Sequence, residues 1–269
     1  MNQTEPMSYR HLAAYRFVTI DDPDGWVSPL EELGAECAVL GTVLLGTEGI
    51  NLGVCLPDAH AERFTTAMSD LPFAPEDYRQ SVADEPSYRR LKVRVKPEII
   101  RFGVDVGADQ RRAPSMDPDE LKRRLDGGEP LLLLDARNRQ EVERGTFRGA
   151  VHLDIGSFGQ FPEALTALER DGRPIVTFCT GGVRCEKSAL YMKDQGFDEV
   201  YQLDGGILEY LARHGAAHYA GDCFVFDERV AVDGDLKPVA GAVYESAEKP
   251  DAAGEEPAAS EPSADPPLC

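Results

Sequence analysis

One short segment of this 269-residue chain has the composition of a nucleophilic loop. An apolar run ends at Cys179, and the residues that follow are Thr180, Gly181, Gly182, Val183 and Arg184. Two glycines allow the backbone to fold into a tight arc at the start of a helix, so that its N–H groups point inward as an anion-binding nest. A nest of this kind, with Arg184 beside it, stabilises a thiolate. We therefore expect Cys179 to have a lowered pKa and to act as a nucleophile near neutral pH.

Three further residues are candidate accessories to Cys179. Cys185 lies six residues downstream, near the first turn of the expected helix, where it is either a resolving thiol or a packed cysteine. Asp135 ends another apolar run, and Arg137 follows two residues later. Ligands of parallel sheets collect beyond the carboxyl ends of the strands, so Asp135 and Cys179 are expected at the same edge.

The segments around these residues predict a doubly wound α/β domain. Continuously apolar strands are expected over 130–135, 175–178 and 199–203, as in a parallel sheet that is covered on both faces. Helices are expected near 161–169 and 185–195, and a further helix follows the cap at 115–118 and runs to residue 125.

The first third of the chain predicts a ferredoxin-like βαββαβ domain. Strands are expected over 11–20, 41–45, 50–56 and 91–95, and helices over 29–40 and 59–71, with Asp58 as the N-cap of the second helix. The last strand alternates, and its basic side chains share one face: Arg90, Lys92, Arg94 and Lys96. This basic stripe is either a solvated strand face or a track for nucleic-acid phosphates.

Several ordered motifs in the second half resemble those of a rhodanese domain. They are Leu134 to Asn138, Glu141, Gly145 to Ala150, the loop from Cys179 to Arg184, and Leu203 to Ile207. The loop has the six-residue length of rhodanese sulfurtransferases. It is one residue shorter than the loop of related dual-specificity phosphatases, which disfavours a phosphatase.

Motifs outside that domain make the chain similar to the TrhO family over roughly residues 10 to 235. The added segments are Gly46 to Asn51, Arg90 to Lys96, Glu186 to Ser188 and Cys223 to Val230. The resemblance implies an oxidoreductase that uses molecular oxygen as co-substrate to convert the wobble uridine of tRNA anticodons to 5-hydroxyuridine. It also places Cys179 at the position of the family's essential cysteine. Many members carry paired cysteines further on, whereas here only Cys269 follows residue 239.

The main alternative is a rhodanese-type sulfurtransferase that carries a persulfide on Cys179. The same loop would hold that persulfide, but a sulfurtransferase has no evident need for an RNA-facing basic strand. No C-x-x-C pair, histidine cluster or dinucleotide fingerprint marks a metal or redox cofactor site, so no metal is expected and the electron donor is undefined.

Composition completes the expected organisation. We expect a ferredoxin-like, RNA-contacting domain over 8–103, a linker over 104–113, a rhodanese domain over 114–220, an extension over 221–239 and a disordered acidic tail over 240–269.

The net charge is −20, of which the last 49 residues carry about −9. No apolar run approaches the roughly 20 residues of a membrane span, and residues 1–15 have no export signal. We therefore expect a cytoplasmic enzyme with tRNA as its partner and no membrane contact.

Overall fold

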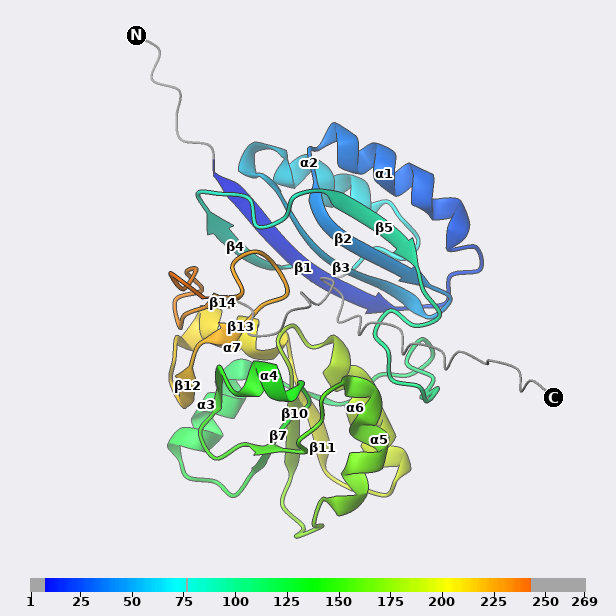
Figure 1. Ribbon diagram of the computed structural model, residues 1–269. Coiled ribbons are helices and arrows are strands. Elements are labelled where there is room, and N and C mark those ends of the chain that lie inside the picture. Colours follow the sequence, from blue (N-terminus) through cyan, green and yellow to red (C-terminus); the bar gives the residue numbers. More distant parts are fainter. Residues whose placement is uncertain (1–7, 76, 243–269) are drawn as a thin grey trace, which may run out of the picture.

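The computed structural model describes residues 8–75 and 77–242, which form two units that each contain a five-stranded sheet (Figure 1). The N-terminal unit consists of β1 (Tyr9–Phe17), α1 (Val27–Glu36), β2 (Leu40–Gly46), β3 (Gly49–Pro57), α2 (Asp58–Ser69), β4 (Arg79–Ala83) and β5 (Leu91–Val95). Its sheet order is β4-β1-β3-β2-β5. All neighbours are antiparallel except β2 and β5, which are parallel. The expected ferredoxin-like domain is confirmed.

Two details of the expected N-terminal unit are wrong. The strand that completes the βαββαβ unit beside β1 is β4, and Leu91–Val95 is a fifth strand at the opposite edge. No hydrophobic alternation marks β4, because it is a short edge strand of mostly polar, incompletely buried residues. Asp58 is the first residue of α2 and not its N-cap, which is Pro57. The Asp58 carboxylate instead accepts a hydrogen bond from Arg10 Nε at 2.5 Å.

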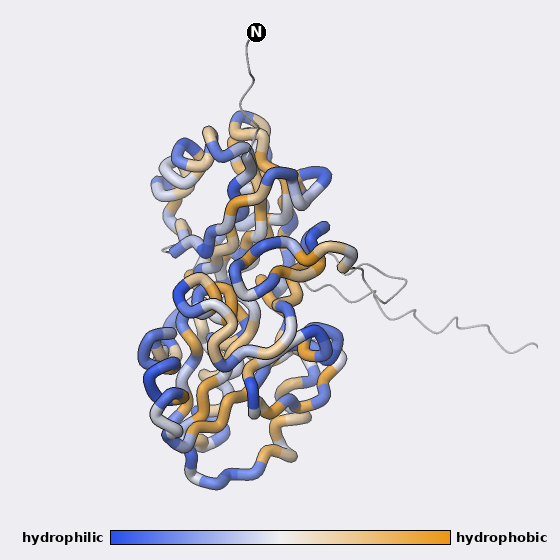
Figure 2. The backbone as a smooth tube through the Cα atoms, turned by 90° about the vertical axis from the view of Figure 1, so that its left-hand side faces the viewer, coloured by the Kyte–Doolittle hydropathy of each residue, from blue (hydrophilic) through white to orange (hydrophobic). Residues whose placement is uncertain are grey.

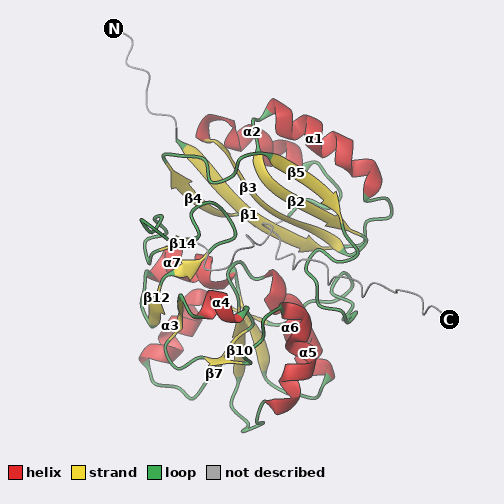
Figure 3. Cartoon of the chain, in the orientation of Figure 1, coloured by secondary structure: helices red, strands yellow, loops and turns green. Residues whose placement is uncertain are grey.

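The two faces of this sheet differ. Helices α1 and α2 cover one face (Figure 3), where Leu12, Val43 and Leu52 belong to a buried apolar cluster. The strand register places side chains of the opposite parity in rows across the other face. One row runs from β4 to β5 through Arg79, Ala13, Gly53, Thr42 and Lys92. This face, which we call the open face, turns toward the second unit.

The second unit is a doubly wound α/β domain, as expected. It consists of β6 (Ser115–Met116), α3 (Pro118–Asp126), β7 (Leu132–Asp135), α4 (Arg139–Val142), β8 (Gly145–Phe147), β9 (Val151–His152), α5 (Phe161–Ala164), β10 (Ile175–Phe178), α6 (Val183–Asp194), β11 (Val200–Leu203) and α7 (Gly206–His214). The sheet is parallel in the order β6-β11-β10-β7-β9. Successive residues of β7, such as Leu133 and Leu134, enter two different apolar clusters because helices cover both faces. The helix expected over 161–169 is shorter and ends in a 3-10 turn over Leu165–Ala167.

The segments between and after the two units pack closely. Residues 104–113, the expected linker, bury Val106, Ala108 and Ala113 in an apolar cluster with residues of the second unit. After β12 (Tyr219–Gly221), strands β13 (Cys223–Phe224) and β14 (Ala231–Val232) form a small hairpin beside the N-terminal unit. Arg229 Nη1 donates to Ser81 Oγ of β4 at 3.1 Å. The expected disordered tail lies, from residue 243 onward, outside the described residues.

A buried lysine joins the two units. Lys187 of α6 is only 2% exposed, and its Nζ lies 2.8 Å from Glu48 and 2.7 Å from Glu98 of the N-terminal part. The same Nζ donates to the Ile100 carbonyl at 3.1 Å. Apolar segments run through the interior of both units while hydrophilic segments lie mostly outside (Figure 2). None of the helices in residues 8–75 and 77–242 has the length and apolarity needed to cross a bilayer.

Candidate active site between the two units

Cys179 lies at the carboxyl end of β10, in the loop that leads into α6. The loop turns through Gly182, whose φ of +98° is a conformation that glycine adopts without strain. The backbone N–H of Gly182 donates to Cys179 Sγ at 3.1 Å. The side chain of Cys179 is 0% exposed, yet Cys179 and the two residues after it line a cavity between the units. The sulfur is therefore shielded from solvent, in a residue that borders the cavity.

The surroundings of Cys179 favour its thiolate. Burial raises the pKa, but hydrogen bonds from the Cys185 thiol and from two backbone N–H groups, together with the charge of Arg184, outweigh it and lower the pKa of Cys179 to about 6. Burial and the neighbouring Cys179 raise the pKa of Cys185 well above its usual value. At neutral pH the two residues are thus a thiolate and a thiol donor.

A buried ion pair fixes the end of this loop. Arg184 donates from both terminal nitrogens to Glu141 of α4, at 2.6 Å and 2.7 Å. The same carboxylate accepts from the backbone N–H of Asn138 at 3.1 Å, which ties it to the start of α4. Glu141 belongs to one of the motifs noted in the sequence. Its bond to Arg184 joins residues 43 positions apart, so no local sequence pattern predicts it. Arg184 therefore lies beside Cys179, and both of its terminal nitrogens are already bonded to a carboxylate.

The accessory candidates Asp135 and Arg137 pair with each other. Both are 0% exposed, and Arg137 Nη2 donates to Asp135 Oδ2 at 2.7 Å and to the Gly145 carbonyl at 2.6 Å. Thr146 Oγ1 also donates to Asp135. Neither residue lines the cavity. This ion pair connects β7 to β8, and β7 pairs with β10, the strand that leads into the Cys179 loop.

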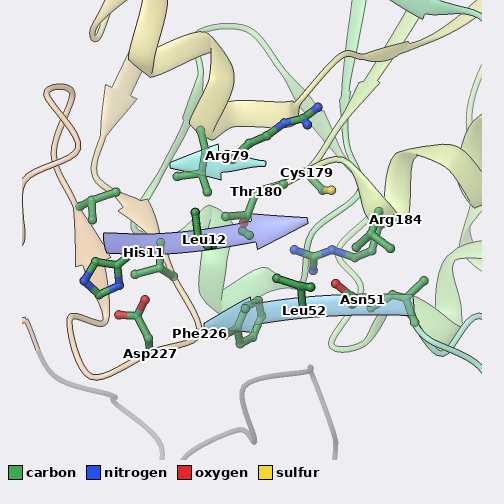
Figure 4. Close-up of a pocket in the computed structure, with 18 of the residues that line it drawn as sticks. His11, Leu12, Asn51, Leu52, Arg79, Cys179, Thr180, Arg184, Phe226 and Asp227 are labelled. Carbon is green, nitrogen blue, oxygen red and sulfur yellow. The ribbon is translucent and has the colours of Figure 1, made fainter. Parts of the chain in front are cut away.

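The cavity has a volume of about 200 Å³ and lies between the Cys179 loop and the open face of the N-terminal sheet (Figure 4). Strands β1, β3 and β4 form one wall, the loop after Cys179 forms the opposite wall, and the β13–β14 hairpin closes one side. The residues that line it include His11, Ala13, Gly53, Arg79, Cys179 and Phe226.

Two side chains of the N-terminal unit lie at the Cys179 loop, and the sequence analysis predicted neither of them. A Cβ on Gly182 would lie 3.2 Å from the hydroxyl oxygen of Tyr15, so this ring of β1 packs directly on the loop. Arg79 of β4 lines the cavity and makes a long 3.4 Å bond to Asp204. Its buried Nε has no hydrogen-bond partner among the described residues. Arg79 belongs to the strand that hydrophobic alternation does not reveal, which is why sequence reasoning passed over it.

The basic stripe lies at the far edge of the open face. The side chains of Leu91, Val93 and Val95 pack with the apolar cluster under the helices, so the alternating Lys92, Arg94 and Lys96 belong to the open face. Lys92 is two strands away from Gly53 of the cavity wall, a distance of about 10 Å. Arg90 is exposed just before β5. The stripe thus flanks the cavity without touching Cys179.

The described residues contain no group of three or more His, Cys, Asp or Glu side chains arranged to hold a metal ion. The chemistry of the site is that of a thiolate, a second thiol and a nearby guanidinium.

Comparisons with known proteins agree with this two-unit arrangement. Residues 9–99 match the UPF0176 acylphosphatase like domain, and residues 117–213 match the rhodanese-like domain. A protein of Burkholderia ambifaria (strain MC40-6) named tRNA uridine(34) hydroxylase is 43% identical over 245 residues, which are 86% of either chain. A protein of the same name from Cupriavidus necator is 42% identical over 241 residues, again 86% of either chain. The rhodanese-like domain of an Anabaena protein is 24% identical, with a TM-score of 0.36, over 50% of this chain and 92% of that one.

Proposed function

The chain belongs to the family of tRNA uridine(34) hydroxylases, and we propose that the Cys179 thiolate is the nucleophile with which it hydroxylates the wobble uridine of tRNA. The observation that carries this role is a thiolate-forming cysteine, with a pKa of about 6, on the wall of a cavity between two units. We also propose a cytoplasmic location, where a tRNA substrate would be met.

The thiolate begins the reaction by adding to C6 of the uracil ring. The electron pair of the C5–C6 double bond then moves to C5 and O4 as an enolate, which makes C5 a nucleophile. Molecular oxygen, the proposed co-substrate, accepts this electron pair and forms a hydroperoxide at C5. Two electrons and two protons reduce the hydroperoxide to a hydroxyl group and water. Loss of the C5 proton and of the thiolate from C6 restores the double bond and leaves 5-hydroxyuridine.

Cys185 is the accessory residue that we assign to the reduction step. Its thiol attacks the outer hydroperoxide oxygen, which leaves the C5 hydroxyl group and a sulfenic acid on Cys185. After Cys179 leaves C6, its thiolate condenses with the sulfenic acid to give a disulfide and water. The hydrogen bond between these two thiols in the resting site supports the step. A cellular thiol reductant then returns both cysteines to the starting state.

Arg79 is suited to stabilise the enolate. Arg79 lines the cavity, and its unpartnered Nε–H is buried beside Gly205, next to the Cys179 loop. Negative charge develops on O4 as the thiolate adds. A buried N–H without a hydrogen-bond partner costs free energy, and a substrate oxygen would satisfy it. The basic stripe of β5 then holds phosphates of the anticodon stem and loop beside the cavity.

The test is nucleoside mass spectrometry of tRNA from a strain that lacks the gene, complemented with wild type, Cys179→Ser or Cys37→Ala. Cys37 is buried on the helix side of the N-terminal sheet and serves as the matched control. We expect wild type and Cys37→Ala to restore 5-hydroxyuridine-derived nucleosides and Cys179→Ser to fail while it still binds tRNA. Hydroxylation by Cys179→Ser would refute the role of the thiolate. A constant hydroxyuridine pool with depleted thiolated nucleosides would instead support the sulfurtransferase, which the family match does not favour.

The role of Cys185 has its own test. One turnover under oxygen without added reductant should leave a disulfide between Cys179 and Cys185, detected by mass spectrometry of the peptides. The Cys185→Ser variant should form product only when an external thiol is supplied. Turnover of wild type that leaves both thiols reduced would make Cys185 a packing residue.

A further inference from the structure

The end of the cavity opposite Cys179 contains a buried histidine with an unused ring nitrogen. His11 of β1 lines the cavity and is only 5% exposed. Its Nδ1 lies 2.8 Å from Ser87 Oγ, while its Nε2 has no hydrogen-bond partner among the described residues. Burial lowers the pKa of His11 to about 4, and the charge of Arg229 acts in the same direction. The ring is therefore neutral at physiological pH and can recognise a group only by a directional hydrogen bond.

This histidine lies too far along the cavity to contact a base that reacts at Cys179. His11 and Tyr15 both lie on β1, four residues apart, which corresponds to about 13 Å of strand. Tyr15 packs on the Cys179 loop, and His11 lies at the other end of the drawn pocket, beside Asp227 (Figure 4). This separation is much longer than the roughly 3.4 Å between stacked bases, so a second base at the His11 end would be splayed away from the first.

The walls near His11 fit a flat, uncharged ring. Between the two ends, the sheet side of the cavity includes Ala13 and Gly53, and the hydroxyl oxygen of Tyr88 lies 3.1 Å from the position that a Cβ on Gly53 would take. The half-buried ring of Phe226 lines the same cavity between His11 and the Cys179 loop, where the Arg184 guanidinium lies 5.8 Å from the ring centroid, and its other face can stack on a base. The nearby Arg229 guanidinium is bonded to Asp227 through Nε at 2.9 Å, so this charge pair is satisfied within the protein. Ser81 and Tyr88 also line this end of the cavity. Because the neighbouring charges are paired and His11 is neutral, this end suits the uncharged edge of a base better than a phosphate.

We propose that the His11 end of the cavity is a second base-binding subsite, which takes the unpaired base directly adjacent to the reacting uridine. This subsite rests on the proposed function, because the neighbouring base is placed by uridine 34 at Cys179. Phe226 stacks on that base, and His11 Nε2 makes a hydrogen bond with its edge. The enzyme then reads a dinucleotide of the anticodon loop and not a lone uridine.

The test is a binding cycle with the full chain and anticodon stem–loop RNAs that carry an abasic site at position 33, at position 35 or at neither. Dissociation constants are measured by fluorescence anisotropy for wild type, His11→Ala and the control His60→Ala. His60 lies on α2, on the far side of the sheet from the cavity. We expect His11→Ala to weaken binding of the intact RNA about fivefold to tenfold. An abasic site at one of the two positions should remove that penalty, because the partner of His11 is then already missing.

The result that overturns the subsite is a His11→Ala penalty that is the same on all three RNAs, or no penalty on the intact RNA. Equal coupling to both abasic positions also overturns it, since one imidazole edge cannot contact both neighbours of uridine 34. If His11→Ala does not fold, His11→Phe keeps the ring in place without its nitrogens and should show the same coupling. The binding cycle needs no turnover. If the His11→Ala penalty disappears on one abasic RNA but the enzyme does not hydroxylate tRNA, only the proposed chemistry is refuted. If the enzyme hydroxylates tRNA normally but the penalty does not depend on the abasic position, only the subsite is refuted.

Discussion

On the rhodanese side of the cavity, the donors that stabilise the Cys179 thiolate are bonded. Arg184 is held by Glu141, and Cys179 accepts from the Gly182 N–H. Arg137, which does not line the cavity, is bonded to Asp135, although its Nη1 has no partner among the described residues. On the sheet side, two cavity-lining groups are left incomplete, since Arg79 Nε and His11 Nε2 are both buried without a partner among the described residues.

This difference separates two tasks. A thiolate must exist before the substrate arrives, so the donors that stabilise it are bonded in the resting protein. A donor or acceptor that is not bonded within the protein is available to the substrate, so groups that read the RNA are expected among the polar atoms without a protein partner. Substitutions on the rhodanese side should therefore reduce stability and thiolate formation, whereas substitutions on the sheet side should reduce affinity for RNA.

The largest expected effect is a loss of stability on removal of Glu141, the partner of Arg184. Glu141→Ala leaves the buried Arg184 guanidinium without its carboxylate, which typically costs about 3 to 5 kcal/mol. We expect urea denaturation to show a loss of this size in the free energy of unfolding. The control is Glu143→Ala, an exposed glutamate two residues later, with a change within about 0.5 kcal/mol. Similar losses for the two variants would contradict a loop fixed by the Arg184 ion pair.

The thiolate itself gives the second prediction. With a pKa of about 6, Cys179 is roughly nine-tenths ionised at pH 7, whereas a thiol of pKa 9.0 is ionised to roughly one part in a hundred. The pKa is lowered, so the thiolate forms as the pH rises through 6 and is lost as the pH falls below it. Alkylation by iodoacetamide, followed by peptide mass spectrometry, should rise to half its maximum near pH 6 for Cys179. A midpoint near pH 9 would show that the loop does not stabilise the thiolate.

The two sides of the cavity also differ in how far the sequence predicts them. The apolar strands β7 and β10 and the glycine-rich loop after Cys179 are local patterns, and they lead directly to a parallel sheet with Cys179 at its carboxyl edge. The sheet side depends on contacts between distant residues, such as Arg79 with Asp204, 125 positions apart. Arg79 also belongs to an edge strand without apolar alternation, so neither the strand nor its position opposite Cys179 can be inferred from local patterning.

Arg79 gives the largest expected effect on the sheet side. Arg79→Gln removes a charged donor that we assign to the enolate oxygen, a bond usually worth about 1.5 to 3 kcal/mol, so kcat/KM for a tRNA transcript should fall about tenfold to a hundredfold. Because its bond to Asp204 is long and Asp204 is half exposed, the free energy of unfolding should change little. Arg79→Lys keeps the charge but loses the Nε donor and should recover only part of the rate. Full activity of Arg79→Gln would remove this residue from the mechanism.

The smallest effect should come from single positions in the basic stripe, which act on phosphates in water and not inside the cavity. Lys92→Gln should weaken tRNA binding only about twofold to fivefold, and it should reduce the slope of log Kd against log salt by about 0.7 if its partner is a single-stranded phosphate. Cys179 alkylation and unfolding should be unchanged, because Lys92 is at the far edge of the open face. The control is Arg63→Gln on α2, which removes the same charge from an exposed position on the helix side. If Arg63→Gln reduced the salt slope as much as Lys92→Gln, the stripe would contribute only general charge, and RNA binding would not be localised to the open face.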